Sequence, residues 1–284
     1  MSTVVLFQGV TMDFRKIYSE SKFVREQVKK LQKISSVDIE KTCKKTQSCD
    51  PARTMREQPA IFAVSMAKFM ENPISDICLT VGHSFGEYAA LCASGVLTIE
   101  DAMRVSEERG NLTALSNLRQ RGDMAVIIGQ ITKSNLSQII RPICQEQDID
   151  LAGVNSPEQA TISGPIHSLS NACDLLQEYN FTTVPINAGC AFHSWCMMDI
   201  KDEFRKFLDT VHFSTPEIPI LMNATASCEE NPERIKDSLV MQLTQPVDFP
   251  IVVNAMKEYD VEKLHEVGAK KTLIGFIKKI RGKK

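Results

Sequence analysis

The sequence contains no apolar run of the roughly 18 residues that a membrane helix needs. Its short apolar N-terminus has no basic leader in front of it, so no signal-peptide pattern is present. Neither charge is in excess, because 33 lysine and arginine residues stand against 35 acidic residues. These absences predict a cytoplasmic protein that binds neither a membrane nor nucleic acid.

Cysteine patterns are also absent. The nine cysteines are scattered and odd in number, which is not typical of a disulfide framework. No Cys-x-x-Cys pair is present, and no zinc ribbon or other metal site is predicted. There is no internal repeat and no low-complexity segment, and 43% of the 284 residues are hydrophobic, enough for a sizeable core. We therefore expect a folded protein of a reducing compartment.

Short apolar runs alternate with segments of helical spacing, which predicts an α/β fold. Residues 35–53 are polar, and we expect them to be irregular. Pro59 is expected in the first turn of its helix. The elements predicted outside the middle of the chain are strands at 4–7, 77–81, 218–223 and 261–267, and helices at 14–33, from Gln58-Pro59 to Asn72, at 87–93, from Thr98, at 235–243 and at 272–280.

The middle of the chain changes character. Its expected order is a strand at 124–129, a helix at 134–145, paired strands at 149–155 and 160–164, a helix at 167–179 and a strand at 182–186. This β-α-β-β-α-β order is typical of a ferredoxin-like subdomain. We therefore predict a hydrolase-like large subdomain with a parallel sheet, formed by 1–122 and 189–284, and a small ferredoxin-like subdomain, 123–188, inserted into it.

The strongest local motif is Gly82-His83-Ser84-Phe85-Gly86, which joins a predicted buried strand to a predicted helix. A Gly-x-Ser-x-Gly turn in that position is typical of a nucleophile elbow, because the glycines leave room for a sharp turn that exposes the serine. The pattern predicts Ser84 as the nucleophile. It also predicts that the backbone amide of Phe85 forms half of an oxyanion hole.

A serine nucleophile needs a base, and the residues alone leave two of the five histidines as candidates. His193 lies in a predicted loop where the chain returns to the large subdomain. His265 lies near the C-terminus, where an α/β-hydrolase places its histidine. Arg109, 25 residues after Ser84, is either an ordinary surface arginine or a guanidinium that binds a substrate carboxylate.

Several separate motifs, in one order over roughly 4–281, resemble malonyl-CoA:acyl carrier protein transacylases and the acyltransferase domains of polyketide synthases. They are Gly82-His83-Ser84-Phe85-Gly86-Glu87-Tyr88, Gln58-Pro59-Ala60-Ile61-Phe62, Arg109-Gly110, Val154-Asn155-Ser156-Pro157, Ala191-Phe192-His193-Ser194, Gln242-Leu243 with Pro246-Val247, and Glu266-Val267-Gly268. The resemblance implies a freestanding acyltransferase that moves malonyl from malonyl-CoA to the phosphopantetheine thiol of an acyl carrier protein, through a malonyl-serine, for polyketide or fatty acid synthesis. It implies no cofactor, since malonyl-CoA is a substrate.

The resemblance also implies roles for single residues. His193 is the expected base, oriented by backbone groups near Gln242 in place of an acidic third residue. Arg109 is expected to bind the malonyl carboxylate, and Asn155 to lie near the acyl or CoA site. The amides expected to hold the oxyanion are those of Gln8 and Phe85.

The chain departs from the family pattern at three places. The Pro-Gly that precedes Gln8 in the family is missing, and the loop after it is shorter. Thr113 stands where many relatives have methionine, which we expect to change the acyl pocket. Trp195-Cys196 is unusual after the histidine. Phe85 and Ala191-Phe192-His193, in contrast, are typical of malonyl rather than methylmalonyl enzymes.

Three alternatives stay open beside transfer, one of them a generic α/β-hydrolase esterase with His265 as its base and a partner carboxylate. A trans-acting acyl hydrolase would use the same Ser84 and His193 and let water attack, clearing acyl groups from carrier proteins; the retained Arg109 favours transfer. A non-enzymatic docking module would be expected to have lost the serine or the histidine, and this chain has both.

The two histidine candidates make opposite predictions. If His193 is the base, His193→Ala should lower the rate of malonyl-CoA cleavage by ~10³-fold or more, while His265→Ala should leave it nearly unchanged. Release of free CoA thiol measures both rates. Loss of activity in the His265 variant, with the His193 variant active, would instead support the α/β-hydrolase arrangement.

Overall fold

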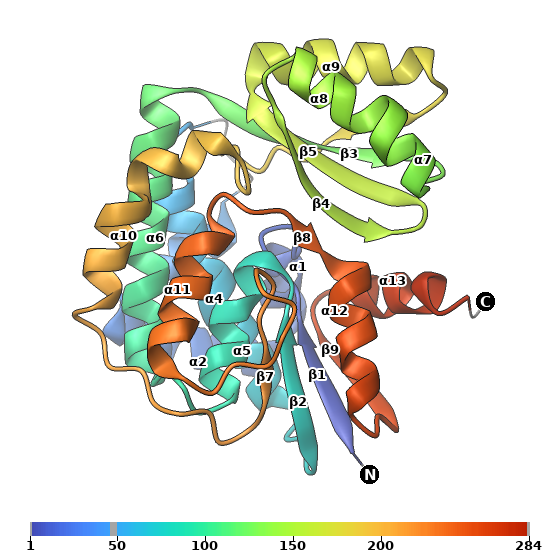
Figure 1. Cartoon of the computed structure of the whole chain (residues 1–284). Coiled ribbons are helices and arrows are strands. Elements are labelled where there is room, and N and C mark those ends of the chain that lie inside the picture. Colours follow the sequence, from blue (N-terminus) through green and yellow to red (C-terminus); the bar gives the residue numbers. More distant parts are fainter. Residues whose placement is uncertain (1, 46–49, 283–284) are drawn as a thin grey trace.

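The computed structural model describes residues 2–45 and 50–282, and Cys49 lies outside them. The chain forms two sheets, one above the other in Figure 1. The first sheet is parallel, with the strand order β7-β2-β1-β9. Its strands are β1 (Thr3–Phe7), β2 (Ile77–Gly82), β7 (Ile220–Leu221) and β9 (Lys263–Val267).

Strand β1 is buried along its whole length and contributes to two cores. Val5 and Phe7 pack into one core, while Val4 and Leu6 pack into another. Successive side chains of a strand point to opposite faces, so helices must cover both sides of this sheet. That requirement explains why β1 is an unbroken apolar run.

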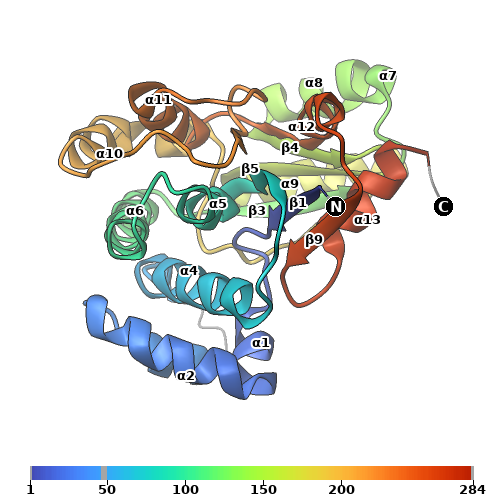
Figure 2. The ribbon, with the colours of Figure 1, turned by 90° about the horizontal axis from the view of Figure 1, so that it is seen from below.

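The helices of this part lie on both faces of the first sheet. Figure 2 shows α2 outside α4, with α6 against the other side of α4. The helices are α1 (Phe14–Glu20), α2 (Lys22–Leu31), α3 (Ile39–Lys44), α4 (Thr54–Glu71), α5 (Glu87–Ala93), α6 (Ile99–Arg119), α10 (Lys201–Leu208), α11 (Pro232–Gln242), α12 (Phe249–Ala255) and α13 (Thr272–Ile280), with the 3-10 helices η1 (Gln32–Ile34), η2 (Ser84–Gly86), η4 (Trp195–Ile200) and η5 (Met256–Glu258).

The second sheet has the order β6-β3-β5-β4-β8. Strands β3 (Gly122–Ile128), β4 (Asp150–Ser156), β5 (Gln159–Pro165) and β6 (Thr182–Pro185) pair antiparallel, and β8 (Val247–Asp248) joins β4 in parallel. Helices α8 (Arg141–Glu146) and α9 (Ile166–Glu178) cover one face (Figure 1). The predicted α/β class is confirmed. The subdomain boundaries at 122/123 and 188/189 stay predictions, and β8 reaches this sheet from beyond them.

Three helix predictions were wrong in detail. The helix expected at 14–33 is interrupted at Ser21, whose side chain accepts a hydrogen bond from the amide of Val24 and so begins α2. Helix α3 lies in the segment expected to be irregular. Helix α4 begins at Thr54, so Pro59 lies inside it and not in its first turn. At this earlier start the Thr54 hydroxyl donates to the carbonyl of Gly110, a contact between α4 and α6.

The helix expected at 134–145 is present in three parts. They are α7 (Lys133–Asn135), the π-helical stretch η3 (Leu136–Ile140) and α8. Pro142 has no amide hydrogen and clashes with the preceding turn, which explains the widened π-helical stretch before it. Helices α10 and α12 fall in segments for which the sequence predicts no element.

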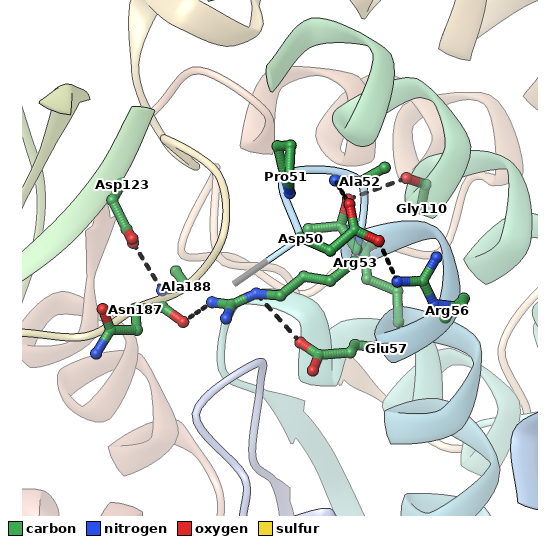
Figure 3. Close-up of polar contacts among 12 residues, drawn as sticks. Asp50, Pro51, Ala52, Arg53, Arg56, Glu57, Gly110, Asp123, Asn187 and Ala188 are labelled. Atoms are coloured by element: carbon green, nitrogen blue, oxygen red, sulfur yellow. Dashed lines mark hydrogen bonds and ion pairs between the residues drawn. The ribbon is translucent and has the colours of Figure 1, made fainter. Parts of the chain in front are cut away.

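Arg53 joins α4 to the segment that returns from the second sheet to the first (Figure 3). Its side chain is buried, and it donates to the carbonyl of Asn187 and lies 3.5 Å from Glu57 Oε2. On the other side of the segment, Asp123 Oδ1 accepts a hydrogen bond of 2.7 Å from the amide of Ala188. The returning segment is therefore held at both sides shortly before it reaches His193.

Loss of the Arg53 side chain should destabilise the fold. We expect Arg53→Met to lower the free energy of unfolding by about 1–3 kcal/mol, because a buried charged donor is lost. Arg56→Met is the matched control: Arg56 pairs with Asp50 at a partly exposed position, where such pairs contribute less than about 1 kcal/mol. Urea unfolding measures both, and equal losses would contradict the role assigned to Arg53.

Candidate active site

The motif around Ser84 forms a tight turn between β2 and α5. Ser84 has a φ of 54°, in the left-handed region that side chains rarely adopt, and this marks a strained backbone. A Cβ atom at Gly82 would collide with the backbone of Glu87, and one at Gly86 with the backbone of Phe7. Only glycine fits at both positions, which explains the spacing of the motif.

Ser84 and His193 come together in the structure. Ser84 Oγ lies 2.6 Å from His193 Nε2. On the other side of the ring, His193 Nδ1 lies 2.8 Å from the carbonyl oxygen of Gln242 and 3.2 Å from that of Gln245. Because carbonyl oxygens only accept, Nδ1 carries the proton, and Nε2 is free to accept the serine proton.

The surroundings keep His193 neutral. Burial, together with the nearby positive charge of Arg109, lowers the pKa of His193 to about 3. Two carbonyl groups replace the carboxylate of a Ser-His-Asp triad, so no negative charge from that side raises this pKa. A neutral imidazole at physiological pH is the form that can remove a proton.

Side chains from distant segments hold the backbone around Ser84. Asn223 Oδ1 accepts from the Ser84 amide at 2.7 Å, and Asn223 Nδ2 donates to the carbonyl of Gly82 at 2.6 Å. Gln242 Nε2 donates to the carbonyl of Ser84 at 3.0 Å. Both Asn223 and Gln242 also donate to the buried carboxyl of Glu87, and burial raises its pKa to about 8 despite these bonds. Gln242 therefore contacts both the serine turn and the histidine.

Arg109 is buried beside the Ser84–His193 pair, with only 1% of its surface exposed. Its Nη1 donates to Gln58 Oε1 at 2.8 Å, and its Nε has no hydrogen-bond partner. Within the described residues, no carboxylate lies at ion-pair distance from it. The carboxyl of Glu87 is near enough for Arg109 to lower its pKa, but burial outweighs this effect and favours the neutral carboxyl. Three aromatic rings lie 5.1–5.7 Å from the guanidinium carbon, those of Phe85, Tyr88 and Phe192.

A small cavity of about 50 Å³ lies over Ser84 and His193. Asn155 lines it, and its Oδ1 lies 3.2 Å from His83 Nε2. Burial lowers the pKa of His83 to about 4, so this ring is neutral too. A larger cavity of about 420 Å³, lined in part by Gln58 and Phe192, shares wall residues Val10, Thr11 and Ile186 with the first.

The structure places the two predicted oxyanion groups differently. The amide of Phe85 follows Ser84 directly at the turn. Gln8 does not line the cavity: its amide donates to the carbonyl of Val267 at 3.3 Å, and its side chain bonds to Lys270 and Glu266. His265 lies on β9, where it pairs with Val5 of β1.

The sequence predictions did not include Asn223, Glu87 or Gln245 in a site role, and they gave Thr113 only an expected effect on the acyl pocket. Asn223 is the last residue of the strand predicted at 218–223, and the carboxyl ends of parallel strands meet at one edge of a sheet, which could have indicated it. Glu87 is an acidic residue in an otherwise apolar helix segment, which is also a usable signal.

Comparison with known proteins identifies the family. A protein-family model described as "Acyl transferase domain" matches residues 16–269 of the chain. A malonyl CoA-acyl carrier protein transacylase of Bacillus subtilis (strain 168) is 31% identical over 232 residues, which cover 80% of this chain and 73% of the relative. The malonyl CoA-acyl carrier protein transacylase of Escherichia coli (strain K12) is 30% identical over 234 residues, which cover 80% of this chain and 75% of the relative. The polyketide biosynthesis protein ThaF of Burkholderia thailandensis is 29% identical, and the match spans only 20% of its length.

Solved structures agree with this result. A malonyl-transacylase in complex with a type II polyketide-synthase acyl carrier protein superposes with a TM-score of 0.86 at 25% identity, covering 99% of this chain and 94% of the other. An acyl carrier protein S-malonyltransferase of Vibrio cholerae superposes with a TM-score of 0.81 at 28% identity, covering 98% of this chain and 93% of the other. The fold is thus that of an α/β protein with a serine turn at the end of a parallel strand. The chain belongs to the acyl transferase family and is an acyltransferase, which confirms the resemblance predicted from the motifs.

Two properties complete the description of the molecule. None of the helices in the described ranges has the length and apolar character to cross a membrane. The eight cysteines that the structure describes are all free thiols.

The low pKa of His193 has a kinetic consequence. Acylation of Ser84 by malonyl-CoA should stay level as the pH falls from about 8 to about 5, because His193 remains neutral over that range, whereas an ordinary histidine is half protonated near pH 6.5. Quenched-flow mass spectrometry measures the acylation rate, and circular dichroism checks the fold at each pH. A loss of rate with a midpoint near 6.5 would show that His193 titrates normally.

Proposed function

We propose that this chain is a discrete, trans-acting acyltransferase that moves malonyl from malonyl-CoA to the phosphopantetheine thiol of an acyl carrier protein, for polyketide or fatty acid synthesis. One observation carries the proposal: a buried arginine without a counter-ion lies beside the Ser84–His193 pair. An unpaired buried charge is unfavourable, so a substrate carboxylate is the partner this site lacks.

In the first half-reaction, His193 Nε2 takes the proton from Ser84 Oγ, which attacks the thioester carbonyl of malonyl-CoA. The amide of Phe85 stabilises the negative oxygen. The bond to sulfur then breaks, CoA leaves with the proton from His193, and a malonyl-serine ester remains. Asn155, on the cavity wall, lies where it can contact the acyl or CoA part.

In the second half-reaction, the thiol of the carrier protein gives its proton to His193 and attacks the ester. The new carbon–sulfur bond forms, the bond to Ser84 Oγ breaks, and Ser84 regains the proton. Gln242 serves both steps, because its carbonyl orients His193 while its side chain holds the backbone of Ser84. The steps use side chains of this chain and two substrates, with no cofactor.

The second oxyanion donor in this proposal is the amide of Gln8. In the structure this amide donates to Val267, so the role requires that hydrogen bond to be exchanged for one to the substrate. At 3.3 Å the existing bond is long and correspondingly weak, which supports such an exchange.

Arg109 selects the acyl group in this proposal. Its planar guanidinium can pair with a carboxylate through two parallel hydrogen bonds, and an acetyl group would leave it unpaired. Because aromatic rings cover Arg109, the carboxylate reaches it only when those rings move. The names of the relatives support malonyl as the acyl group and an acyl carrier protein as the partner.

The test is intact-protein mass spectrometry after brief mixing with malonyl-CoA or acetyl-CoA, followed by addition of holo acyl carrier protein. We expect a malonyl adduct on Ser84 that moves to the carrier, with little acetyl adduct, and none in Ser84→Ala. Arg109→Ala should lower malonyl acylation by ~100-fold and reduce the preference over acetyl, since the charged pair is lost.

The same measurement separates transfer from hydrolysis. Acyl groups that are lost to water with no transfer to the carrier, with acetyl preferred, would identify an acyl hydrolase. That outcome would also show that Arg109 does not bind the acyl group.

A further inference from the structure

Thr113 belongs to a buried chain of hydrogen bonds that ends on Arg109. The Thr113 hydroxyl lies 2.8 Å from the carbonyl oxygen of Arg109, one turn earlier in α6. Gln58 Nε2, on α4, lies 2.9 Å from Thr113 Oγ1, and Gln58 Oε1 lies 2.8 Å from Arg109 Nη1. All three side chains are shielded from solvent, with at most 1% exposed.

The direction of each bond in this chain is fixed by chemistry. A hydroxyl has one proton, and its acceptors in α6, the carbonyl of Arg109 at 2.8 Å and that of Gly110 at 3.2 Å, can only accept it. The lone pairs of Thr113 Oγ1 are therefore left to accept from Gln58, so Nε2 of the amide faces Thr113. The carbonyl end of Gln58 then faces Arg109, as a guanidinium requires. The reverse orientation would place the amide NH2 group against another donor.

This arrangement decides which part of Arg109 is free. Gln58 occupies Nη1, and the Nε of the same guanidinium has no partner. Gln58 also lines the 420 Å³ cavity that adjoins the cavity over Ser84. A guanidinium held at one nitrogen keeps a defined orientation, so it loses less side-chain entropy when a carboxylate binds its remaining donors after the covering rings have moved.

We propose that Thr113 is a positioning residue for acyl-group selectivity: its hydroxyl sets the orientation of Gln58, which holds Arg109 ready for the malonyl carboxylate. This inference rests on the proposed function. In this proposal Thr113 acts through its hydroxyl group and not through the shape that its side chain gives to the pocket.

The experiment compares Ser84 acylation by malonyl-CoA and acetyl-CoA in matched variants. Thr113→Val removes the hydroxyl at nearly constant shape, and we expect the ratio of kcat/KM for malonyl over acetyl to fall about tenfold, the effect of one lost hydrogen bond to a group paired with a charge. The loss should come mainly from a higher KM for malonyl-CoA, with acetyl acylation unchanged. Thr113→Ser should restore the ratio.

Thr54→Val is the control. Thr54 is also buried, and its hydroxyl also donates to α6, at the carbonyl of Gly110, but it does not bond to Gln58. The ratio of kcat/KM for malonyl over acetyl should stay unchanged in Thr54→Val. Melting temperatures of all variants show whether each of them is folded. An equal fall in both valine variants, or an unchanged ratio in a folded Thr113→Val, would overturn the inference.

A double variant keeps the test decisive if Thr113→Val folds poorly by itself. Thr113 acts through Gln58 in this proposal, so Thr113→Val should reduce selectivity no further in a Gln58→Ala background. Additive losses would overturn it. If the unmodified protein forms a malonyl-Ser84 adduct and only these comparisons fail, the proposed function stands without the inference. If no malonyl adduct forms at all, both are wrong.

Discussion

The hydrogen bonds that Asn223 and Gln242 make to the backbone beside Ser84 are the constraint on which the site depends. A serine in a left-handed conformation is strained, and such a conformation persists only where its surroundings over-determine it. Asn223 holds the amide and Gln242 the carbonyl of the same residue. Since the backbone carbonyl of Gln242 also accepts from His193 Nδ1, a single residue contacts both Ser84 and His193 and fixes them relative to each other.

The protonation states of the buried groups depend on the same packing. Burial favours neutral His193 and raises the pKa of Glu87, so Arg109 is the fixed charge at the centre of the site. Its aromatic surroundings shield it from water without neutralising it. A carboxylate that enters therefore gains a strong interaction in a medium of low polarity, while a neutral acyl group gains none. Burial is the main cause of the low pKa of His193, and the positive charge of Arg109 lowers it further, so the group that would select the acyl group in the proposed reaction also favours neutral His193.

Local patterns were predictable from the sequence, whereas long-range pairings were not. The α/β class and the turn at Ser84 follow from apolar runs and glycine spacing. Spacing alone could not separate His193 from His265, because only the folded chain brings residue 193 within 2.6 Å of Ser84. At the start of α4, Thr54 contacts Gly110 far along the chain, and the bond between Glu87 and Asn223 joins residues 136 positions apart. Helix propensity and periodicity contain no information about such contacts.

The loop after β1 is held in place by its own side-chain contacts. Gln8 donates to Glu266 and to the carbonyl of Lys270, which ties the loop to the end of β9. The main chain lies against the serine turn: a Cβ at Gly9 would lie 2.5 Å from the carbonyl oxygen of His83 and 3.3 Å from the amide nitrogen of Phe85. A side chain cannot be placed there, so the position must be glycine. Gly9 lines the cavity over Ser84 together with Val10 and Thr11, so the main chain of this loop forms one wall of the cavity beside the serine turn.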